Sequence, residues 1–262
     1  MSAIVIDGEI VHFEVLGRGK PVIFLHGWVG SWRYWIPNMQ AISFSFRGYA
    51  IDFWGYGDTA KKQNRYTLEH QVTLLEDFIH KMGIGKISLI GHGLGAVIGV
   101  LFCQSHLSQV DRLMLMGLPL KTNILDAKVI ALTPAEQAER LLGRNHTIES
   151  TLLEVSKTDV SVIRKMYSDV QQIELAMLVR ESSLPSLYVN GKYDPLIEIP
   201  SLEDVSFLPE ESHYILFEQS GHFPMLDEPS KFNRLLIDFL NLGQDESPRV
   251  LQLKEEWKRR VR

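Results

Sequence analysis

The chain has 262 residues, of which 45% are hydrophobic and 23% charged, and its formal net charge is -5. This composition is ordinary for a globular domain with its own apolar core, and the acidic balance argues against nucleic acid as the main partner. The single cysteine, Cys103, excludes a disulfide within the chain. The sequence shows neither a signal-peptide pattern nor an apolar run long enough to cross a membrane, so we expect a cytoplasmic protein without integral membrane association.

Short apolar runs recur along the chain and predict buried strands. Asp7-Gly8 divides the first β-branched segment, residues 4–16, and predicts a hairpin. The later runs are Val22–Leu25, Tyr49–Ile51, Ile87–Ile90, Leu113–Met116, Leu187–Val189 and Tyr214–Phe217. Continuous runs of this length are typical of parallel strands that are covered on both faces.

Helical patterns separate these runs. Thr67 is a candidate cap for an amphipathic helix that ends at Gly83, and Pro229 opens another helix before Gly243. Strands that alternate with helices predict an α/β fold with a doubly wound, mostly parallel sheet. We assign residues 1–118 and 186–243 to this core.

Residues 119–185 interrupt the alternation, because they contain helical patterns but no clear strand. Ligands bind at the carboxyl ends of parallel strands, so we expect this insertion to form a small helical lid there. Additional packing helices would produce the same pattern. The apolar residues of the insertion would suit a small apolar or ester-like substrate or ligand.

Residues 244–262 predict an amphipathic tail helix with Ser247 as its cap. Its apolar side would carry Val250, Leu253, Trp257 and Val261. Such a helix most often docks on its own domain, and a membrane-surface or partner role is the alternative.

The loop His26-Gly27-Trp28 follows the predicted strand that ends at Leu25. Gly27 allows a tight turn, and a backbone N–H after such a turn can donate to an oxyanion. The dipeptide is common, so alone it is a weak indication of catalysis. A second loop, residues 52–58, carries two glycines after another strand, and we interpret it as a structural turn.

A third loop, Gly91-His92-Gly93-Leu94-Gly95, joins a predicted strand to an apolar helix. In the nucleophile elbow G-x-S-x-G, a serine occupies a sharp turn between a strand and a helix. Small residues two positions before and after it let the strand and the helix pack closely. Gly91 and Gly95 meet this requirement, and Gly93 occupies the position of the serine.

Asp194 and His222 each follow a late predicted strand. An aspartate at a strand end can orient an imidazole, and a histidine can act as a general base near neutral pH. Either residue alone is equally consistent with an ordinary loop.

Taken in order, these motifs resemble the α/β-hydrolase superfamily, in the group of small cytosolic esterases, C–C hydrolases and related enzymes. The resemblance covers about residues 4–243 and agrees with the family's chain order of nucleophile, acid and base. It implies Asp194 as the catalytic acid, His222 as the base and Gly93 as a vacant nucleophile position.

The same resemblance implies that His26, Gly27 and Trp28 form the oxyanion loop. The backbone N–H groups of Trp28 and Leu94 would then form the oxyanion hole.

Gly93 cannot form an acyl-enzyme, so we expect ordinary serine-hydrolase activity to be absent or very weak. Three interpretations remain open. Gly93 is a knockout, by descent or by engineering, of a working hydrolase; or the protein is a pseudoenzyme that binds a small ligand; or the Asp194–His222 pair carries out serine-independent hydrolase or lyase chemistry.

Three other residues are weak candidates for a replacement nucleophile. Cys103 lies ten residues beyond Gly93, or about 15 Å along the following helix, and should point into packing. The side chain of His92 should point away from the pocket, and Ser31 should cap the next helix.

The sequence contains no metal-ligand spacing, phosphate loop or dinucleotide fingerprint, so we expect neither a metal nor a cofactor. The sequence leaves the oligomeric state open.

Overall fold

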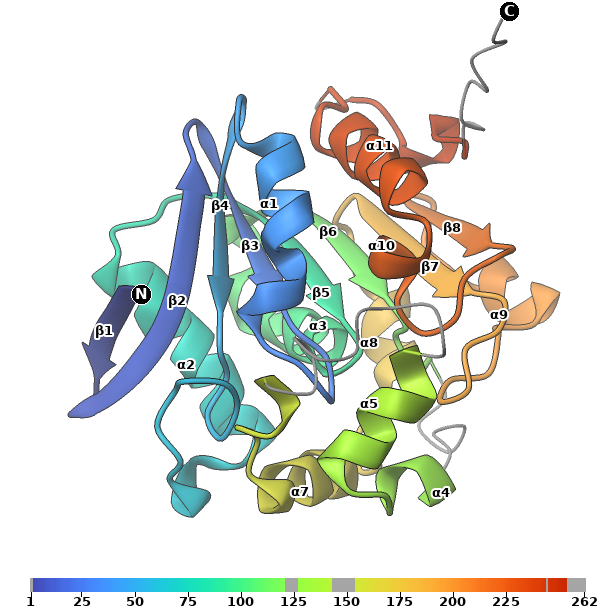
Figure 1. Ribbon diagram of the computed structural model, residues 1–262. Coiled ribbons are helices and arrows are strands. Elements are labelled where there is room, and N and C mark those ends of the chain that lie inside the picture. Colours follow the sequence, from blue (N-terminus) through green and yellow to red (C-terminus); the bar gives the residue numbers. More distant parts are fainter. Residues whose placement is uncertain (1, 121–126, 143–153, 244, 254–262) are drawn as a thin grey trace, which may run out of the picture.

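The computed structural model describes residues 2–120, 127–142, 154–243 and 245–253. One eight-stranded sheet forms its centre, with the strand order β1-β2-β4-β3-β5-β6-β7-β8 (Figure 1). The strands are β1 Ser2–Ile6, β2 Glu9–Gly17, β3 Lys20–Leu25, β4 Phe46–Ile51, β5 Ile87–His92, β6 Val110–Met116, β7 Ser186–Gly191 and β8 Ser212–Phe217. β2 pairs antiparallel with β1 and β4, and all other neighbours are parallel. The predicted doubly wound, mostly parallel α/β fold is confirmed.

Helices cover both faces of the sheet (Figure 1). They are α1 Ile36–Ile42, α2 Leu68–Lys81, α3 Leu94–His106, α4 Ala127–Ile130, α5 Pro134–Leu142, α7 Val160–Val170, α8 Leu175–Arg180, α9 Leu202–Ser206, α10 Pro224–Asp227 and α11 Pro229–Leu240. Single 3-10 turns are η1 Trp32–Trp35, η2 Gln63–Arg65, η3 Leu107–Gln109 and η6 Pro248–Val250. α1 packs with α11, whereas α3 packs with α2 and α8. Among the described helices, none is long and apolar enough to span a bilayer.

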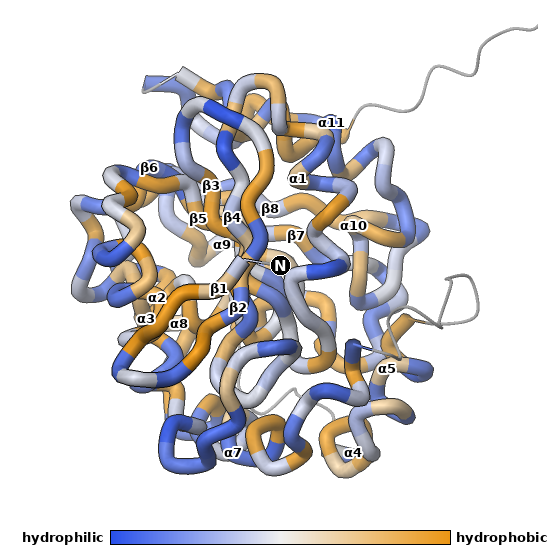
Figure 2. The backbone as a smooth tube through the Cα atoms, turned by 60° about the vertical axis from the view of Figure 1, so that its left-hand side comes forward, coloured by the Kyte–Doolittle hydropathy of each residue, from blue (hydrophilic) through white to orange (hydrophobic). Residues whose placement is uncertain are grey.

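The local signals in the sequence explain where these elements begin. Thr67 accepts a hydrogen bond from the backbone N–H of His70 and so caps α2, and Pro229 occupies the first turn of α11. Every residue of β5 is buried, as expected for a parallel strand at the centre of the sheet. The hydrophobic outer hairpin lies at the surface (Figure 2), where Val5 and Ile10 are each more than half exposed.

The insertion between β6 and β7 contains α4, α5, α7 and α8 and, in its described parts, no strand. In Figure 1, α4, α5 and α7 lie beyond the carboxyl ends of the strands. The Asp159 N–H donates to the Gly55 carbonyl at 2.9 Å, and the Tyr66 hydroxyl donates to Asp159 Oδ2 at 3.1 Å. The insertion is therefore fastened to the loop that follows β4.

The tail differs from the predicted helix within its described part. Ser247 accepts a hydrogen bond from the Arg249 N–H, as a cap would, but only one 3-10 turn follows. The backbone is extended at Leu251, whose buried side chain packs on the domain. The prediction of a helix from Ser247 through Leu253 is therefore wrong, because the chain leaves helical geometry after Val250. Residues 254–262, with Trp257 and Val261, lie outside the described residues.

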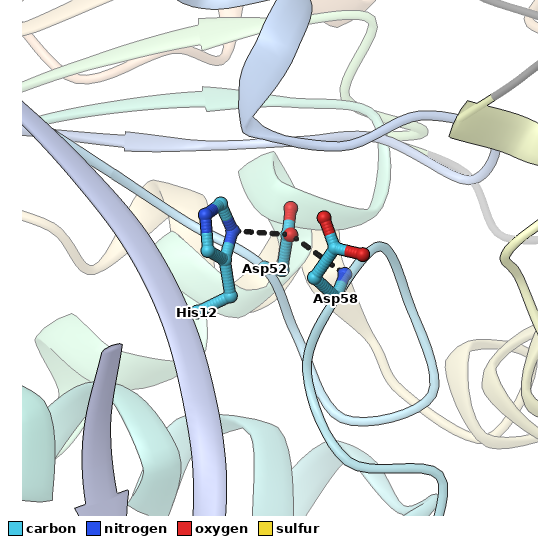
Figure 3. Close-up of side chains that lie close together, drawn as sticks. All are labelled: His12, Asp52 and Asp58. Carbon is cyan, nitrogen blue, oxygen red and sulfur yellow. Dashed lines mark hydrogen bonds and ion pairs between the residues drawn. The ribbon is translucent and has the colours of Figure 1, made fainter. Parts of the chain in front are cut away.

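The loop after β4 is held by a buried ion pair (Figure 3). The His12 Nδ1–H donates to Asp52 Oδ2 at 2.9 Å, and Asp52 also accepts from the N–H groups of Trp32 and Asp58. Ligand atoms of His12, Asp52 and Asp58 lie within 4.8 Å of one another, a spacing that a metal ion could use. Asp58 also pairs with Lys157 at 3.0 Å. Because these bonds already engage both carboxylates, we interpret the cluster as the anchor of a structural loop.

The ion pair makes stability depend on pH. Burial alone would lower the pKa of His12, but the hydrogen bond and the charge of Asp52 outweigh it and raise the pKa. Burial alone would raise the pKa of Asp52, but the hydrogen bonds that it accepts, above all from His12, outweigh burial and lower the pKa. A raised histidine pKa adds stability that is complete below the unfolded value, about 6.5, and is lost as pH rises through the folded value.

We therefore expect the loss of unfolding free energy in His12→Gln to be largest near pH 6 and to shrink as the pH is raised toward 9. Urea unfolding of the unmodified protein and of His12→Gln, across this pH range, measures the difference in unfolding free energy. The other histidines are common to both proteins and largely cancel in the difference. A difference that stays constant with pH would contradict the ion pair.

Candidate active site

The turn between β5 and α3 has backbone geometry that glycine adopts easily. Gly93 has φ 50° and ψ -111°, a region that residues with a Cβ rarely enter. Its N–H donates to the Met116 carbonyl at 2.8 Å, and its own carbonyl accepts from the N–H groups of Ala96 and Val97. The turn is therefore fixed to β6 on one side and to α3 on the other.

The flanking glycines allow the close packing that the sequence predicts. A Cβ on Gly91 would lie 2.5 Å from the Gly95 carbonyl oxygen, and a Cβ on Gly95 would lie 2.4 Å from the Leu25 carbonyl oxygen. Carbon cannot approach backbone oxygen so closely, so β3, β5 and α3 meet here only because both residues lack side chains.

The structure brings together Asp194 and His222, which sequence analysis named as acid and base. Asp194 follows β7, and its Oδ1 accepts hydrogen bonds from the N–H groups of Leu196 and Ile197 at 2.8 and 3.1 Å. Its Oδ2 lies 2.7 Å from His222 Nδ1, and both side chains are only 1% exposed. Since the ionised carboxylate can only accept, His222 donates from Nδ1. In the described structure, His222 Nε2 is buried and has no hydrogen-bond partner.

The predicted oxyanion loop is held in place by His26. The His26 Nδ1–H donates to the Gly27 carbonyl at 3.0 Å, and its Nε2 accepts from the Phe53 N–H at 3.1 Å. Complete burial lowers the pKa of His26 and keeps it neutral, as this pairing requires. Within the part of the chain that the structure describes, the backbone N–H groups of Trp28 and Leu94 have no acceptor. They are therefore available as donors.

The Trp28 side chain lies against Gly93, a contact that sequence analysis missed. A Cβ built on Gly93 would lie 3.0 Å from Cδ1 and 3.2 Å from Nε1 of the indole. Trp28 is 1% exposed, and its Nε1 is another buried polar atom without a partner among the described residues. No local pattern in the sequence signals this contact, because it joins two loops 65 residues apart.

His92 makes hydrogen bonds to both His222 and Tyr34. Its ring lies 4.5 Å from the His222 ring, its Nε2–H donates to the His222 carbonyl at 2.9 Å, and its Nδ1 accepts from the Tyr34 hydroxyl at 3.1 Å. The Tyr34 oxygen in turn accepts from the Gly27 N–H at 2.6 Å. Burial and neighbouring His222 hold the pKa of His92 well below its usual value. Its ring therefore stays neutral and, through Tyr34, links His222 to the loop that carries Gly27.

The other residues weighed as replacement nucleophiles are engaged elsewhere. Cys103 is buried in α3, and burial raises the pKa of its thiol to about 12. Ser31 caps η1 by accepting from the Arg33 N–H, and its hydroxyl donates to Glu154 at 3.2 Å.

The Gly93 turn follows a parallel strand, and the ring of its neighbour His92 contacts His222, which pairs with buried Asp194. A family model for the alpha/beta hydrolase fold matches residues 20–154, just over half of the chain. The chain therefore belongs to the α/β-hydrolase fold family.

Two curated relatives match most of the chain. The first, a 2-hydroxy-6-oxo-6-(2'-aminophenyl)hexa-2,4-dienoic acid hydrolase of Metapseudomonas resinovorans, is 25% identical over 87% of each chain. The second, a pimeloyl-[acyl-carrier protein] methyl ester esterase of Vibrio cholerae, is 23% identical over 87% of this chain and 97% of its own.

Among solved structures, the fold is similar to a serine-to-glycine variant of the N-acyl homoserine lactonase AidH in complex with N-hexanoyl homoserine lactone. The TM-score is 0.80 at 21% identity, over 91% of this chain and 96% of the lactonase.

The hydrogen-bond chain through Tyr34 yields a stability prediction. Tyr34→Phe leaves the Gly27 N–H and His92 Nδ1 buried without partners, so we expect the unfolding free energy to fall by about 2 kcal/mol. Denaturant unfolding measures it, with Tyr193→Phe as the matched control because Tyr193 is 64% exposed. Equal stability of the two variants would show that the Tyr34 hydroxyl carries no such role.

Proposed function

We propose that this protein binds a small ester-like or apolar carbonyl compound at the Asp194–His222 site and forms no acyl-enzyme. The observation that carries the proposal is the combination of a nucleophile-type elbow at Gly93 with an intact, buried Asp–His pair. Ordinary serine-hydrolase activity is then absent or very weak, since removing the nucleophile of a serine hydrolase costs roughly a factor of 10⁶ in turnover.

The arrangement of donors supports a carbonyl ligand. The free N–H groups of Trp28 and Leu94 suit an oxygen that gains negative charge, the role of an oxyanion hole. One of the two curated relatives is named for the hydrolysis of an oxo-dienoic acid and the other for that of a methyl ester, and both names describe compounds with a carbonyl group. In the same proposal, residues 119–185 act as the lid over this ligand and the protein works in the cytoplasm.

A second candidate function is serine-independent hydrolase or lyase chemistry. It is favoured by the unpartnered Nε2 of His222, which Asp194 orients as a general base should be oriented. A ligand-binding pseudoenzyme and a knockout of a working hydrolase would leave the same Asp–His pair, and the experiments below separate these outcomes.

We expect the unmodified protein to resist labelling by a serine-reactive phosphonate probe, and Gly93→Ser to be labelled and to hydrolyse a short p-nitrophenyl ester faster. The serine Cβ would lie 3.0 Å from the Trp28 ring, so the indole must shift by a few tenths of an ångström. Gly93→Ser with His222→Ala is the control, because it keeps the serine and removes the base.

Covalent labelling of the unmodified protein within the site would overturn the proposal. If Gly93→Ser is correctly folded and still unreactive, the site has diverged beyond one side chain and the ligand-binding alternative is favoured.

A further inference from the structure

We propose that the end of the molecule opposite to the candidate active site docks peripherally on a membrane surface that carries anionic lipids. We call this surface the basic face. It consists of one exposed aromatic side chain and the cations around it, namely Arg18, Lys20, Phe44, Arg47 and Lys86. The inference goes beyond the proposed function, which uses none of these residues.

Backbone contacts bring two loops of the basic face together. The Arg18 N–H donates to the Ser43 carbonyl at 3.4 Å, and Gly19 lies so close to the Ser45 carbonyl oxygen that a Cβ on Gly19 would collide with it. The turn between β2 and β3 therefore packs against the loop between α1 and β4. Both loops lie at the top of Figure 1.

The register of the strands places the other cations at the same end. Gly17 pairs with Arg47 across β2 and β4, and Lys20 pairs with Phe46 across β3 and β4. Lys20 and Lys86 line one surface pocket, at the amino ends of β3 and β5. The cations thus come from three parts of the chain and meet at one end of the sheet.

Phe44 supplies an apolar group in the middle of this charge. It stands between Ser43 and Ser45, and 87% of its surface is exposed. A single exposed apolar residue is common and needs no explanation by itself. An exposed aromatic ring among lysines and arginines is different, because it matches the boundary between lipid headgroups and acyl chains, where charge and hydrocarbon lie side by side.

The protein itself neutralises little of this positive charge. Within the described ranges, Arg18, Lys20 and Arg47 have no acidic partner, whereas Lys86 pairs with Asp111 at 3.7 Å. The whole chain carries a formal charge of -5, so the basic face differs in sign from the molecule as a whole. Clustered cations at a surface are attracted by the negative potential of anionic lipids.

The place of the basic face on the fold keeps the candidate active site away from the membrane. The basic face lies at the amino ends of β3, β4 and β5, whereas Gly93 follows the carboxyl end of β5. These strands are parallel, so the two sites lie at opposite ends of the sheet. A docked molecule therefore keeps its site open to the aqueous side.

Sedimentation of the protein with lipid vesicles tests the inference. Vesicles of phosphatidylcholine alone are compared with vesicles of equal parts phosphatidylcholine and phosphatidylglycerol. We expect binding to the anionic vesicles only, and weaker binding as sodium chloride is added, because salt screens the attraction. Arg18→Gln combined with Lys20→Gln should lower the partition coefficient about 25-fold, or about fivefold for each charge.

Phe44→Ser tests the apolar part of the basic face. We expect its partition coefficient to fall by about fivefold, because the ring no longer enters the headgroup layer. Leu202→Ser is the matched control, since Leu202 is 91% exposed but lies on α9. Arg164→Gln is the control for charge, because Arg164 is exposed on α7. Both controls should bind as the unmodified protein does.

Three results would overturn the inference: no binding to the anionic vesicles, equal binding to both kinds of vesicle, or unchanged binding when the basic face is altered. The last result would assign the affinity to another surface. Loss of binding in the charge variant but not in Phe44→Ser would also contradict it, because a surface for soluble polyanions behaves in that way. The proposed function fails on a different readout, covalent labelling of the unmodified protein by the phosphonate probe.

Discussion

The hydrogen bond between His222 and Asp194 decides what this site can do. It commits Nδ1 to the carboxylate and leaves the buried Nε2 without a hydrogen-bond partner among the described residues, which is the state that a general base needs. His92 holds the backbone of His222 through its carbonyl, and Tyr34 joins His92 to the oxyanion loop. Because His92 stays neutral, this link does not change with the protonation of the base.

Gly93 suits the backbone geometry of the elbow, and in the proposed function it removes the covalent nucleophile. The backbone at the elbow keeps the conformation that exposes a nucleophile, and glycine adopts it with little strain. The Trp28 indole lies where a side chain at position 93 would crowd it.

The sequence predicted the features that depend on neighbouring residues. The strands, the caps at Thr67 and Pro229 and the glycines of the elbow follow from local sterics and hydrogen bonding. In the described part of the tail the predicted helix is wrong, because the chain becomes extended at Leu251, whose side chain is buried on the domain. The contact between Trp28 and Gly93 and the chain through Tyr34 join distant loops, so no periodicity or motif could indicate them.

The central claim is that this site works without a covalent intermediate. The most direct measurement is the mass of the intact protein when it is quenched during incubation with a p-nitrophenyl ester. The account predicts that the mass of the intact protein stays that of the unmodified chain throughout the incubation. An acyl group that maps to a side chain of the site, and that disappears in His222→Ala, would contradict it.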